Sequence, residues 1–494
     1  MGVTIVHAQR NDTIRLALQE QLALTYNAQK NFYRSAALRT WQNQFNHSSL
    51  HLNYFNNASD IYLPQLGSGA DGFSIASESF KKLQQGLTLW GNASYKNKKI
   101  RNIVYNETSD YDIVYPYVMS DTVGGDLKSE TYYFNGGLLK NFRKISVGFE
   151  GAYTGELAYR KRDPRPENTS SKIDVILAVS KRLVKDYRIA LDLKGSKYHQ
   201  RNTLSFASNL GAPNIYHDAG LGTYNDLLDG TNASALFNGN NKGVMLGLIS
   251  ENRKGIMFTS GFDQLVIKKR LNNVVGDIGK LTENKGFADL GYLLKSNKSS
   301  YLIKLFGSIK NRKSLEANFN NRGDDIGFVK ISESERFSHH EATAGLSITA
   351  DNIFKVPHLT LSFKTGRVTS SFKYINPNRK LDAVQWNSIF QVGHMLPVKK
   401  ALLTTSARLV FSKNIEASNH WPDVMTGHTF YNMLNQMYTF YSSNYYGLGA
   451  LTRIDIPAFS QFGIYGLLDA EYKNYSAVYN GKGYNIHVGL GVTF

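Results

Sequence analysis

The sequence predicts an all-β fold, namely a single transmembrane antiparallel β-barrel of about 18 strands (16–20) after a short N-terminal helical segment. Three observations predict this fold. Apolar and polar residues alternate over segments of about 10–15 residues, whereas the strands of soluble proteins have about 5–6. Every second connection between these segments is short. The chain contains no run of about 18 uncharged apolar residues that could form a membrane-spanning helix.

The first residues, MGVTIVHAQ, resemble the end of an export signal. Val6, His7 and Ala8 fit the small-x-small pattern that precedes a signal-peptidase cleavage site, so residues 1–8 are interpreted as a signal-peptide remnant. The charged region and most of the apolar region of such a peptide are absent, and an ordinary N-terminus is the alternative interpretation.

Residues 9–45 predict a helical segment that lies either in the periplasm or in the barrel lumen. Asp12 is the candidate N-cap of a helix over residues 12–28. Apolar residues recur at every fourth position of this helix and therefore share one face, which has to be buried. This stripe consists of Ile14, Leu18, Leu22 and Tyr26.

Residues 46–494 predict the barrel. Successive strand residues point to opposite faces of a sheet, so alternation gives each strand an apolar face for lipid and a polar face for the lumen. Because lipid offers no hydrogen-bond partners, the sheet has to close on itself. We place the strands at residues 47–56, 72–81, 84–97, 128–140, 144–157, 171–183, 187–200, 242–252, 255–270, 284–296, 299–312, 337–350, 358–372, 384–396, 400–413, 441–456, 460–474 and 483–494.

The connections between these strands alternate in length. Tight periplasmic turns and long outer loops are typical of membrane barrels, and counting back from Phe494 places both termini in the periplasm. The long connections are predicted at residues 98–127, 158–170, 201–241, 313–336 and 414–440.

Composition and charge narrow the class of partners. The formal net charge is +18, and the basic residues are spread along the whole chain. This distribution favours a nearby anionic surface, such as lipopolysaccharide or phospholipid headgroups, and we expect no nucleic-acid partner. The absence of cysteine excludes disulfides, thiolate metal sites and a cysteine nucleophile.

The C-terminal strand resembles the targeting strand of bacterial outer-membrane β-barrel proteins, which typically ends in an aromatic residue after alternating apolar residues. Its apolar positions are Tyr484, Ile486, Val488, Leu490, Val492 and Phe494. The resemblance implies insertion by the barrel-assembly machinery and a location in the bacterial outer membrane. The chain as a whole is similar to uncharacterised, porin-like families of outer-membrane barrels.

The polar faces of the strands supply charged candidates for the lumen. A lumen of mixed sign can set the preference for an ion or solute, and salt bridges that brace neighbouring strands are the equally weighted alternative. The predicted lumen-facing residues are Glu150, Glu156, Asp192, Lys194, Lys364, Asp469, Glu471 and Lys473.

The outer loops contain residue types that can hold haem or a metal, but not in the required spacing. His339, His340, His420 and His428 lie in or beside predicted loops, and residues 414–440 add methionines, aromatic residues and a candidate short helix. No HExxH or GxSxG motif is present. We therefore predict no cofactor, no metal site and no catalytic residue, and solvated histidines on a packed loop.

The predicted function is a pore or channel for small solutes, because barrels of 16–18 strands are wide enough for an aqueous lumen. The alternative is a non-conducting binding or accessory subunit of a surface uptake complex for haem or iron, which would require a partner protein in the outer membrane. The helical segment of residues 12–44 either sits in the lumen or docks on a periplasmic partner.

Overall fold

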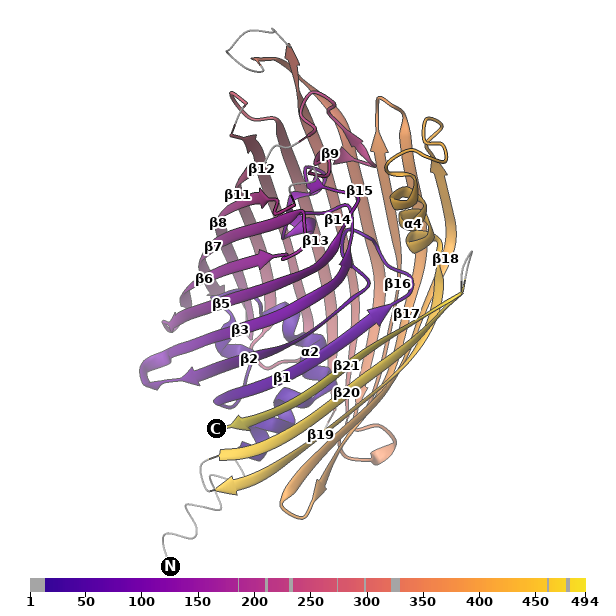
Figure 1. The fold of residues 1–494 in the computed structure, drawn as a ribbon. Coiled ribbons are helices and arrows are strands. Elements are labelled where there is room, and N and C mark those ends of the chain that lie inside the picture. The colour runs from indigo at the N-terminus through magenta and orange to yellow at the C-terminus, as the bar shows by residue number, and fades with distance from the viewer. Residues whose placement is uncertain are drawn as a thin grey trace, which may run out of the picture.

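The protein folds into one closed barrel (Figure 1). The computed structural model describes residues 14–184, 186–208, 212–230, 234–272, 274–296, 299–320, 329–459, 462–476 and 480–494, without the side chains of residues 355 and 459. The proposed signal-peptide remnant and Asp12 lie outside the described residues. An 18-stranded antiparallel sheet closes where β1 pairs with β21, with Ser49 opposite Thr493.

Each predicted strand overlaps one barrel strand, so the prediction of an 18-stranded transmembrane-type barrel is confirmed. The strands are β1 (His47–Ser59), β2 (Gly69–Lys82), β3 (Leu87–Ile103), β5 (Gly125–Asn141), β6 (Ile145–Tyr159), β7 (Arg165–Arg182), β8 (Tyr187–Ser205), β11 (Ser234–Ser250), β12 (Gly255–Leu271), β13 (Gly279–Lys295), β14 (Ser300–Asn320), β15 (Val329–Asp351), β16 (Leu359–Tyr374), β17 (Arg379–Val398), β18 (Ala401–His420), β19 (Asn444–Phe459), β20 (Phe462–Ser476) and β21 (Gly481–Thr493).

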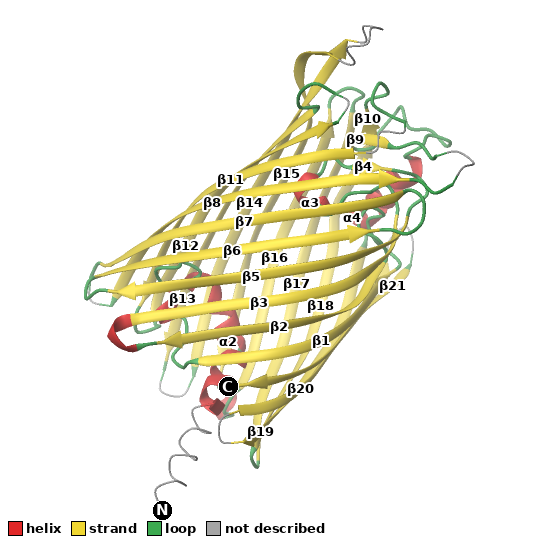
Figure 2. Ribbon diagram, turned by 60° about the vertical axis from the view of Figure 1, so that its left-hand side comes forward, coloured by secondary structure: helices red, strands yellow, loops and turns green. Residues whose placement is uncertain are grey.

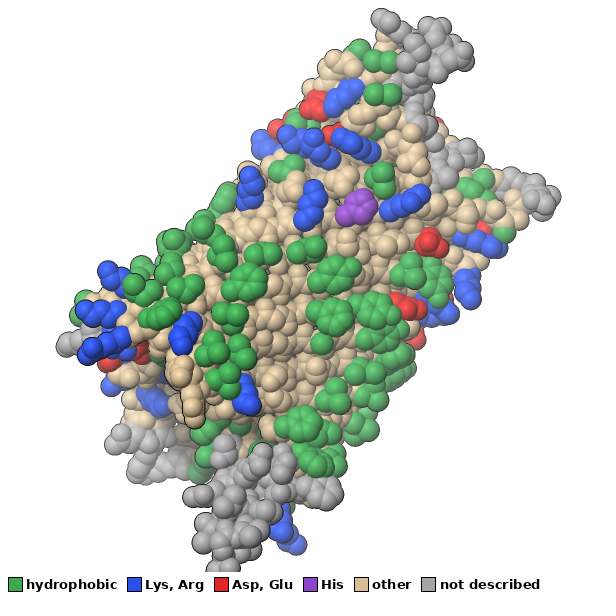
Figure 3. All heavy atoms as spheres, turned by 90° about the vertical axis from the view of Figure 1, so that its left-hand side faces the viewer, with side chains coloured by type: hydrophobic (Ala, Val, Ile, Leu, Met, Phe, Trp, Pro, Cys, Tyr) green, Lys and Arg blue, Asp and Glu red, His purple; other side chains and the backbone are tan. Residues whose placement is uncertain are grey.

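The outer surface carries the apolar side chains that the alternation predicts. On β8, Ile189 and Leu191 are exposed on the outside, whereas Ala190 and Asp192, which alternate with them, are buried. The same alternation around the barrel produces an apolar belt, with Lys and Arg side chains gathered beyond it (Figure 3). A closed sheet with such a belt has the architecture of bacterial outer-membrane β-barrel proteins.

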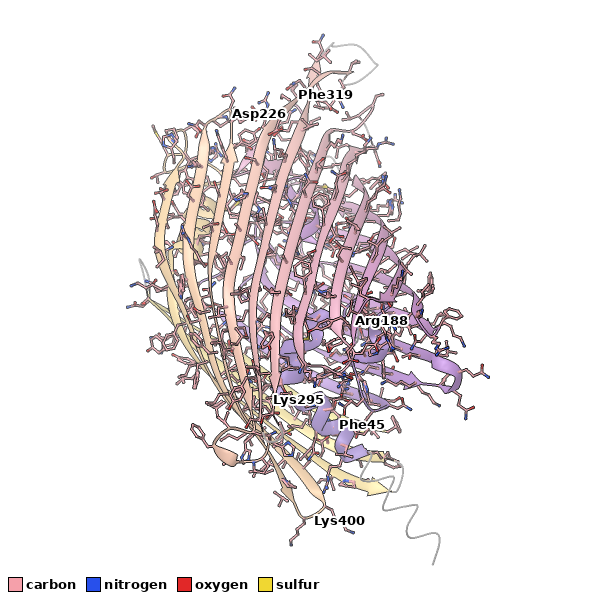
Figure 4. All side chains as sticks on the ribbon, turned by 180° about the vertical axis from the view of Figure 1, so that it is seen from behind. Phe45, Arg188, Asp226, Lys295, Phe319 and Lys400 are labelled. Atoms are coloured by element: carbon pink, nitrogen blue, oxygen red, sulfur yellow. The ribbon has the colours of Figure 1, made fainter. Side chains whose placement is uncertain are left out.

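The two ends of the barrel differ. We call the end with the short strand connections the turn end; it includes residues 142–144 and 251–254 and the C-terminal Phe494. The opposite end is the loop end, where residues 104–124, 206–233 and 421–443 connect strands. In Figure 4, Lys295 and Lys400 lie at the turn end, and Asp226 and Phe319 lie at the loop end.

Short helices and a small sheet complete the fold (Figure 2). Residues 14–22 are helical, and none of the helices in the described part of the chain is long and apolar enough to cross a membrane. The remaining elements are α2 (Leu24–Gln29), α3 (Tyr111–Val114), α4 (Tyr431–Ser442), the 3₁₀ turns η1 (Lys30–Tyr33), η2 (Arg39–Trp41), η3 (Gln84–Gly86) and η4 (Ile353–Lys355), and a three-stranded sheet of β4 (Met119–Ser120), β9 (Tyr216–Gly220) and β10 (Thr223–Tyr224).

The strand boundaries differ most from the prediction in one hairpin. β14 and β15 continue well past the predicted ends at residues 312 and 337, and they project at the loop end (Figures 1 and 2). Polar residues make up much of this extension, for example Lys313, which pairs with Glu335 across 3.1 Å. Beyond the apolar belt, β14 and β15 no longer alternate apolar and polar residues, although their hydrogen-bonded pairing continues.

Candidate functional site

The lumen is occupied at the turn end by an N-terminal insert, which we define as residues 14–44. Figure 1 shows α2 inside the ring of strands. Contacts with opposite walls support this position. Ser35 hydrogen-bonds Asp192 of β8, and Leu24 packs near Gly393 of β17. Residues 14–44 thus lie inside the ring of strands at the turn end.

Two of the predicted lumen-facing carboxylates hold the insert. Asp192 is almost fully buried and accepts hydrogen bonds from the Ser35 hydroxyl and from the backbone amide of Ala36, the latter across 3.2 Å. Glu150 accepts a hydrogen bond from the Trp90 indole across 2.8 Å and contacts the Arg39 guanidinium at 3.4 Å. These carboxylates therefore serve as internal anchors.

Further ionic contacts surround the insert. Arg34 lies 3.2 Å from Asp289 of β13, and Arg253 of the β11–β12 turn lies 2.6 Å from Glu20. Arg188 of β8 stacks over Trp41 with 4.3 Å between the guanidinium carbon and the ring centre, and Figure 4 labels Arg188 beside the insert. The insert is thus tied to the walls on several sides.

Glycines on the inner wall allow the insert to approach the strand backbone. A Cβ atom at Gly148 of β6 would lie 2.4 Å from the backbone of Ala36, and one at Gly291 of β13 would lie 2.6 Å from the Phe32 ring. A Cβ at Gly247 would lie 3.1 Å from Leu38. Contacts this close show that the wall and the insert pack as one body.

The loop end is filled by a second body, the loop plug, which we define as residues 104–124, 212–230 and 421–443. The three segments contain α3, α4 and the small sheet, and they pack on a continuous apolar core with the inner wall (Figure 2). α4 forms where the sequence suggested a short helix, and it contributes Met433, Leu434 and Met437 to this core.

Three wall arginines fasten the three segments of the loop plug. Arg160 contacts Glu107 and Asp121, and all three side chains are buried. Arg312 of β14 donates hydrogen bonds to the backbone oxygens of Tyr115 and Asp112 at 2.6 and 2.7 Å. Arg379 of β17 donates to the Leu221 carbonyl at 2.7 Å and pairs with Asp423 at 2.6 Å.

A titratable pair lies inside the loop plug, on β9. Burial lowers the pKa of His217 well below its usual range, and burial raises the pKa of Asp218 to about 7. Neither ring nitrogen of His217 has a hydrogen-bond partner in the described structure. The charge of Lys269 of β12 also lowers the pKa of His217, and its amine donates to the Val118 carbonyl across 3.1 Å.

The loop histidines do not converge. His339 points inward and stacks on Phe372 at 3.9 Å between ring centres, whereas its neighbour His340 contacts Asn311 at 2.5 Å. His428 contacts Arg379 at 3.3 Å, and His420 ends β18. Within the described ranges, no group of three or more His, Cys, Asp or Glu residues could hold a metal ion.

Two cavities lie along one sector of the inner wall. We call the inner face of β19–β21, β1 and β2 the polar lane. A turn-side cavity of about 260 Å³ lies between this wall and the helix of residues 14–22, and it includes His51, Asn53 and Glu78. A loop-side cavity of about 360 Å³ includes Asn57, Glu471 and His487.

Phe55 lies on β1 between the residues that line the two cavities, and it lines neither of them. Its strand partner His487 lines the loop-side cavity, and the next inward residue of β1, Asn53, lines the turn-side cavity. The Phe55 ring is buried below the Lys96 ammonium, which lies 4.5 Å from its centre. Phe55 is therefore an apolar side chain between the two cavities.

The predicted charged residues thus have different surroundings. At the edge of the lane, Arg408 of the neighbouring strand β18 bridges Asp469 at 2.8 Å and Glu471 at 2.6 Å, and Lys473 lies 3.4 Å from Glu471. Elsewhere, the remaining three have separate partners: Glu156 with Ser129 (2.5 Å), Lys194 with Asp263 (3.8 Å) and Lys364 with the Phe306 ring (4.8 Å).

Sequence reasoning missed the lane residues His51, Glu78 and His487, and also Arg408 of β18 beside the lane. Strand alternation could have identified Glu78, because it lies an odd number of residues from Phe73 and Ile75, which face outward on β2. Which lumen residues stay uncovered depends on the path of the insert and the loops, which strand alternation does not encode.

The sequence model of a family of unknown function, DUF6850, matches residues 35–494. The chain belongs to this family. No curated protein matches it. The DUF6850 family match begins inside the N-terminal insert, so it includes its wall-contacting part from Ser35 onwards as well as the barrel.

Solved structures share the general form of the barrel at low identity. The ferric preacinetobactin receptor BauA from Acinetobacter baumannii is 8% identical, with a TM-score of 0.40, over 90% of this chain and 80% of that chain. The ferric citrate transporter FecA is 8% identical, with a TM-score of 0.38, over 91% and 78%. OccK1 from Pseudomonas aeruginosa is 9% identical, with a TM-score of 0.33, over 91% and 99%.

Proposed function

We propose that this protein is a narrow outer-membrane channel that passes small solutes along the polar lane, past a resident insert and loop plug. The supporting observation is the position of the two cavities, which lie end to end on the same sector and are separated by Phe55. Both cavities include charged and polar side chains, as expected for a path that replaces the hydration of a solute, and the helix of residues 14–22 adds apolar side chains to the turn-side cavity.

The two internal bodies argue against a wide diffusion pore. A barrel of 16–18 strands with an empty interior leaves an aqueous channel. Here Asp192 and Glu150 are among the wall residues that hold the insert, and Arg160, Arg312 and Arg379 hold the loop plug. Solute selection by close contact therefore fits this interior better than free diffusion.

We further propose the orientation of the barrel. The turn end with both termini faces the periplasm, and the loop end faces outward, because short turns and long loops are distributed in this way in membrane barrels. The apolar belt would contact lipid, and the basic residues beyond it would contact lipopolysaccharide. The C-terminal strand would be recognised by the barrel-assembly machinery. The proposed function includes no catalytic step.

Cysteine accessibility tests the proposed path, because the native chain contains no cysteine. We expect single-channel conductance in planar bilayers, and a methanethiosulfonate ethylammonium reagent should reduce it in the Asn57→Cys and His51→Cys variants. The matched control is Ser180→Cys, since Ser180 is buried against the Ala37 carbonyl beneath the insert. The reagent should leave this control unchanged.

One outcome would contradict the channel, and another would contradict its path along the lane. A purified, folded barrel that never conducts would favour the non-conducting accessory role instead. A barrel that conducts but is blocked only through Ser180→Cys would place the path under the insert and not along the lane.

A further inference from the structure

We propose that the turn-side cavity is a binding site for a small organic cation with an apolar body, of the alkylammonium class. The inference depends on the proposed channel for the route by which the ligand arrives. It rests on a carboxylate, a neutralised arginine and an apolar wall that meet in one cavity of about 260 Å³. This volume is below the range of sites for drug-sized ligands and suits a smaller molecule.

The carboxylate is Glu78. It lies on the inner face of β2 opposite Ser49 of β1, and its side chain is exposed to the cavity. In the portion of the chain that the structure describes, Glu78 forms no ion pair. A carboxylate that accepts hydrogen bonds without a fixed cation is suited to the three donors of a primary ammonium group.

The arginine in the same cavity does not cancel this charge. Arg453 donates hydrogen bonds to Asp455 across 2.9 and 2.7 Å, so its charge is already paired. Its guanidinium also stacks on Tyr465 at 3.6 Å from the ring centre. Arg453 and Asp455 together contribute no net charge, and Glu78 leaves the cavity with an excess negative charge that repels carboxylate ligands.

The apolar wall comes from the helix of residues 14–22. Ile14, Leu18 and Leu22, which the sequence places on one helical face, line the cavity together with Leu467 of β20. The apolar face of this helix thus lines a cavity opposite Glu78 and is not fully packed against other side chains. Burial of a ligand methylene against these side chains stabilises the complex by removing apolar surface from water.

Binding to the full-length protein in detergent tests the site, with hexylammonium and hexanoate as probes in titration calorimetry. We expect hexylammonium to bind and hexanoate to bind at least tenfold more weakly. Affinity should rise about two- to fourfold for each methylene added between butylammonium and hexylammonium, in line with the transfer free energy of a buried methylene.

Two variants separate the parts of the site. Glu78→Gln keeps the side-chain size and should weaken hexylammonium at least tenfold, whereas the matched control Glu335→Gln, on the exposed hairpin at the loop end, should not change it. Leu18→Ala should flatten the dependence on chain length while retaining the preference for ammonium over carboxylate.

The outcomes are distinguishable from those of the channel test. Equal affinity for hexylammonium and hexanoate, or an unchanged affinity in Glu78→Gln, would overturn the cation site even if the barrel conducts. Binding that needs Glu78 in a barrel that never conducts would support the site and overturn the proposed channel.

Discussion

The carboxylate of Asp192, on the inner wall, accepts a hydrogen bond from the backbone amide of Ala36, in the insert, across 3.2 Å. The same carboxylate accepts the Ser35 hydroxyl. A wall side chain of β8 therefore holds a segment that precedes the first barrel strand in the chain.

Replacing Asp192 should loosen the insert. We expect Asp192→Ala to lower the free energy of unfolding by about 2–4 kcal/mol, because two buried donors lose a charged acceptor. Urea unfolding in lipid vesicles measures this value. Asp226→Ala, at an exposed position of the loop end, is the control and should change stability by less than about 0.5 kcal/mol. Equal effects in both variants would show that Asp192 does not anchor the insert.

A single methyl group at Gly148 should disturb the same contact. Its Cβ would lie 2.4 Å from the carbonyl carbon and oxygen of Ala36, which cannot move without shifting the insert. We expect Gly148→Ala to destabilise the protein by about 1–3 kcal/mol through overpacking. Gly195→Ala is the matched control, since nothing lies within 4 Å of its added Cβ. Thermal unfolding of the two variants in the same detergent decides the comparison.

Arg160 should be essential for the loop plug. Arg160→Met would leave Glu107 and Asp121 buried without their cation, and we expect a loss of about 3–5 kcal/mol and faster proteolysis of residues 104–124. The control is Arg165→Met, because Arg165 forms an exposed pair with Asp163 and should contribute less than about 1 kcal/mol. Intact proteolytic resistance in Arg160→Met would contradict this role.

The stability of the loop plug should depend on pH through Asp218. Burial raises the pKa of Asp218 to about 7, whereas an unperturbed aspartate titrates near 3.9. The folded plug therefore retains the proton that a released plug loses, and its stability should fall as the pH rises from about 4 to about 7. Asp218→Asn, which keeps an oxygen for the Gly220 amide, should remove this fall.

Hydrogen exchange of residues 215–224, corrected for the intrinsic rate, measures this dependence. His217 acts in the opposite direction: burial lowers its pKa, so stability is lost as the pH falls below about 6.5. The measurement is therefore made in a His217→Gln background. A profile that stays flat there between about pH 4 and 7 would contradict the role of Asp218.

The width of the polar lane should depend on Phe55. We expect Phe55→Ala to increase single-channel conductance, because it removes the ring between the two cavities. Phe73→Ala is the matched control, since Phe73 lies on the outer face of the neighbouring strand β2. An unchanged conductance in Phe55→Ala would show that ions cross the barrel elsewhere.

The barrel wall was predictable because its signal is local. Ile189 and Leu191 face lipid, Ala190 and Asp192 face inward, and the period of two alone separates them. The ends of β14 and β15 were not predictable in this way, because above the belt neither face has to be apolar. Pairing there depends on cross-strand contacts such as that of Lys313 with Glu335.

The contents of the lumen were only partly predictable. The stripe of Ile14, Leu18 and Leu22 predicted a helix whose apolar face has to be buried, but it did not predict which part of the protein covers that face. The positions of Tyr115 and Phe430 in the loop plug result from packing between segments far apart in the chain. Such packing leaves no periodic pattern in the sequence, so the course of the loops could not be predicted from it.

The glycines under the insert have an evolutionary consequence. At Gly148 and Gly291 the missing side chain is useful only because Ala36 and Phe32 occupy the space in front of it. A descendant protein that lost the N-terminal insert could acquire larger residues at these two positions. A descendant that acquired larger residues at these positions could no longer accommodate the insert. Wall and leading segment should therefore be inherited as a matched set, and a comparison of distant members should find them exchanged together.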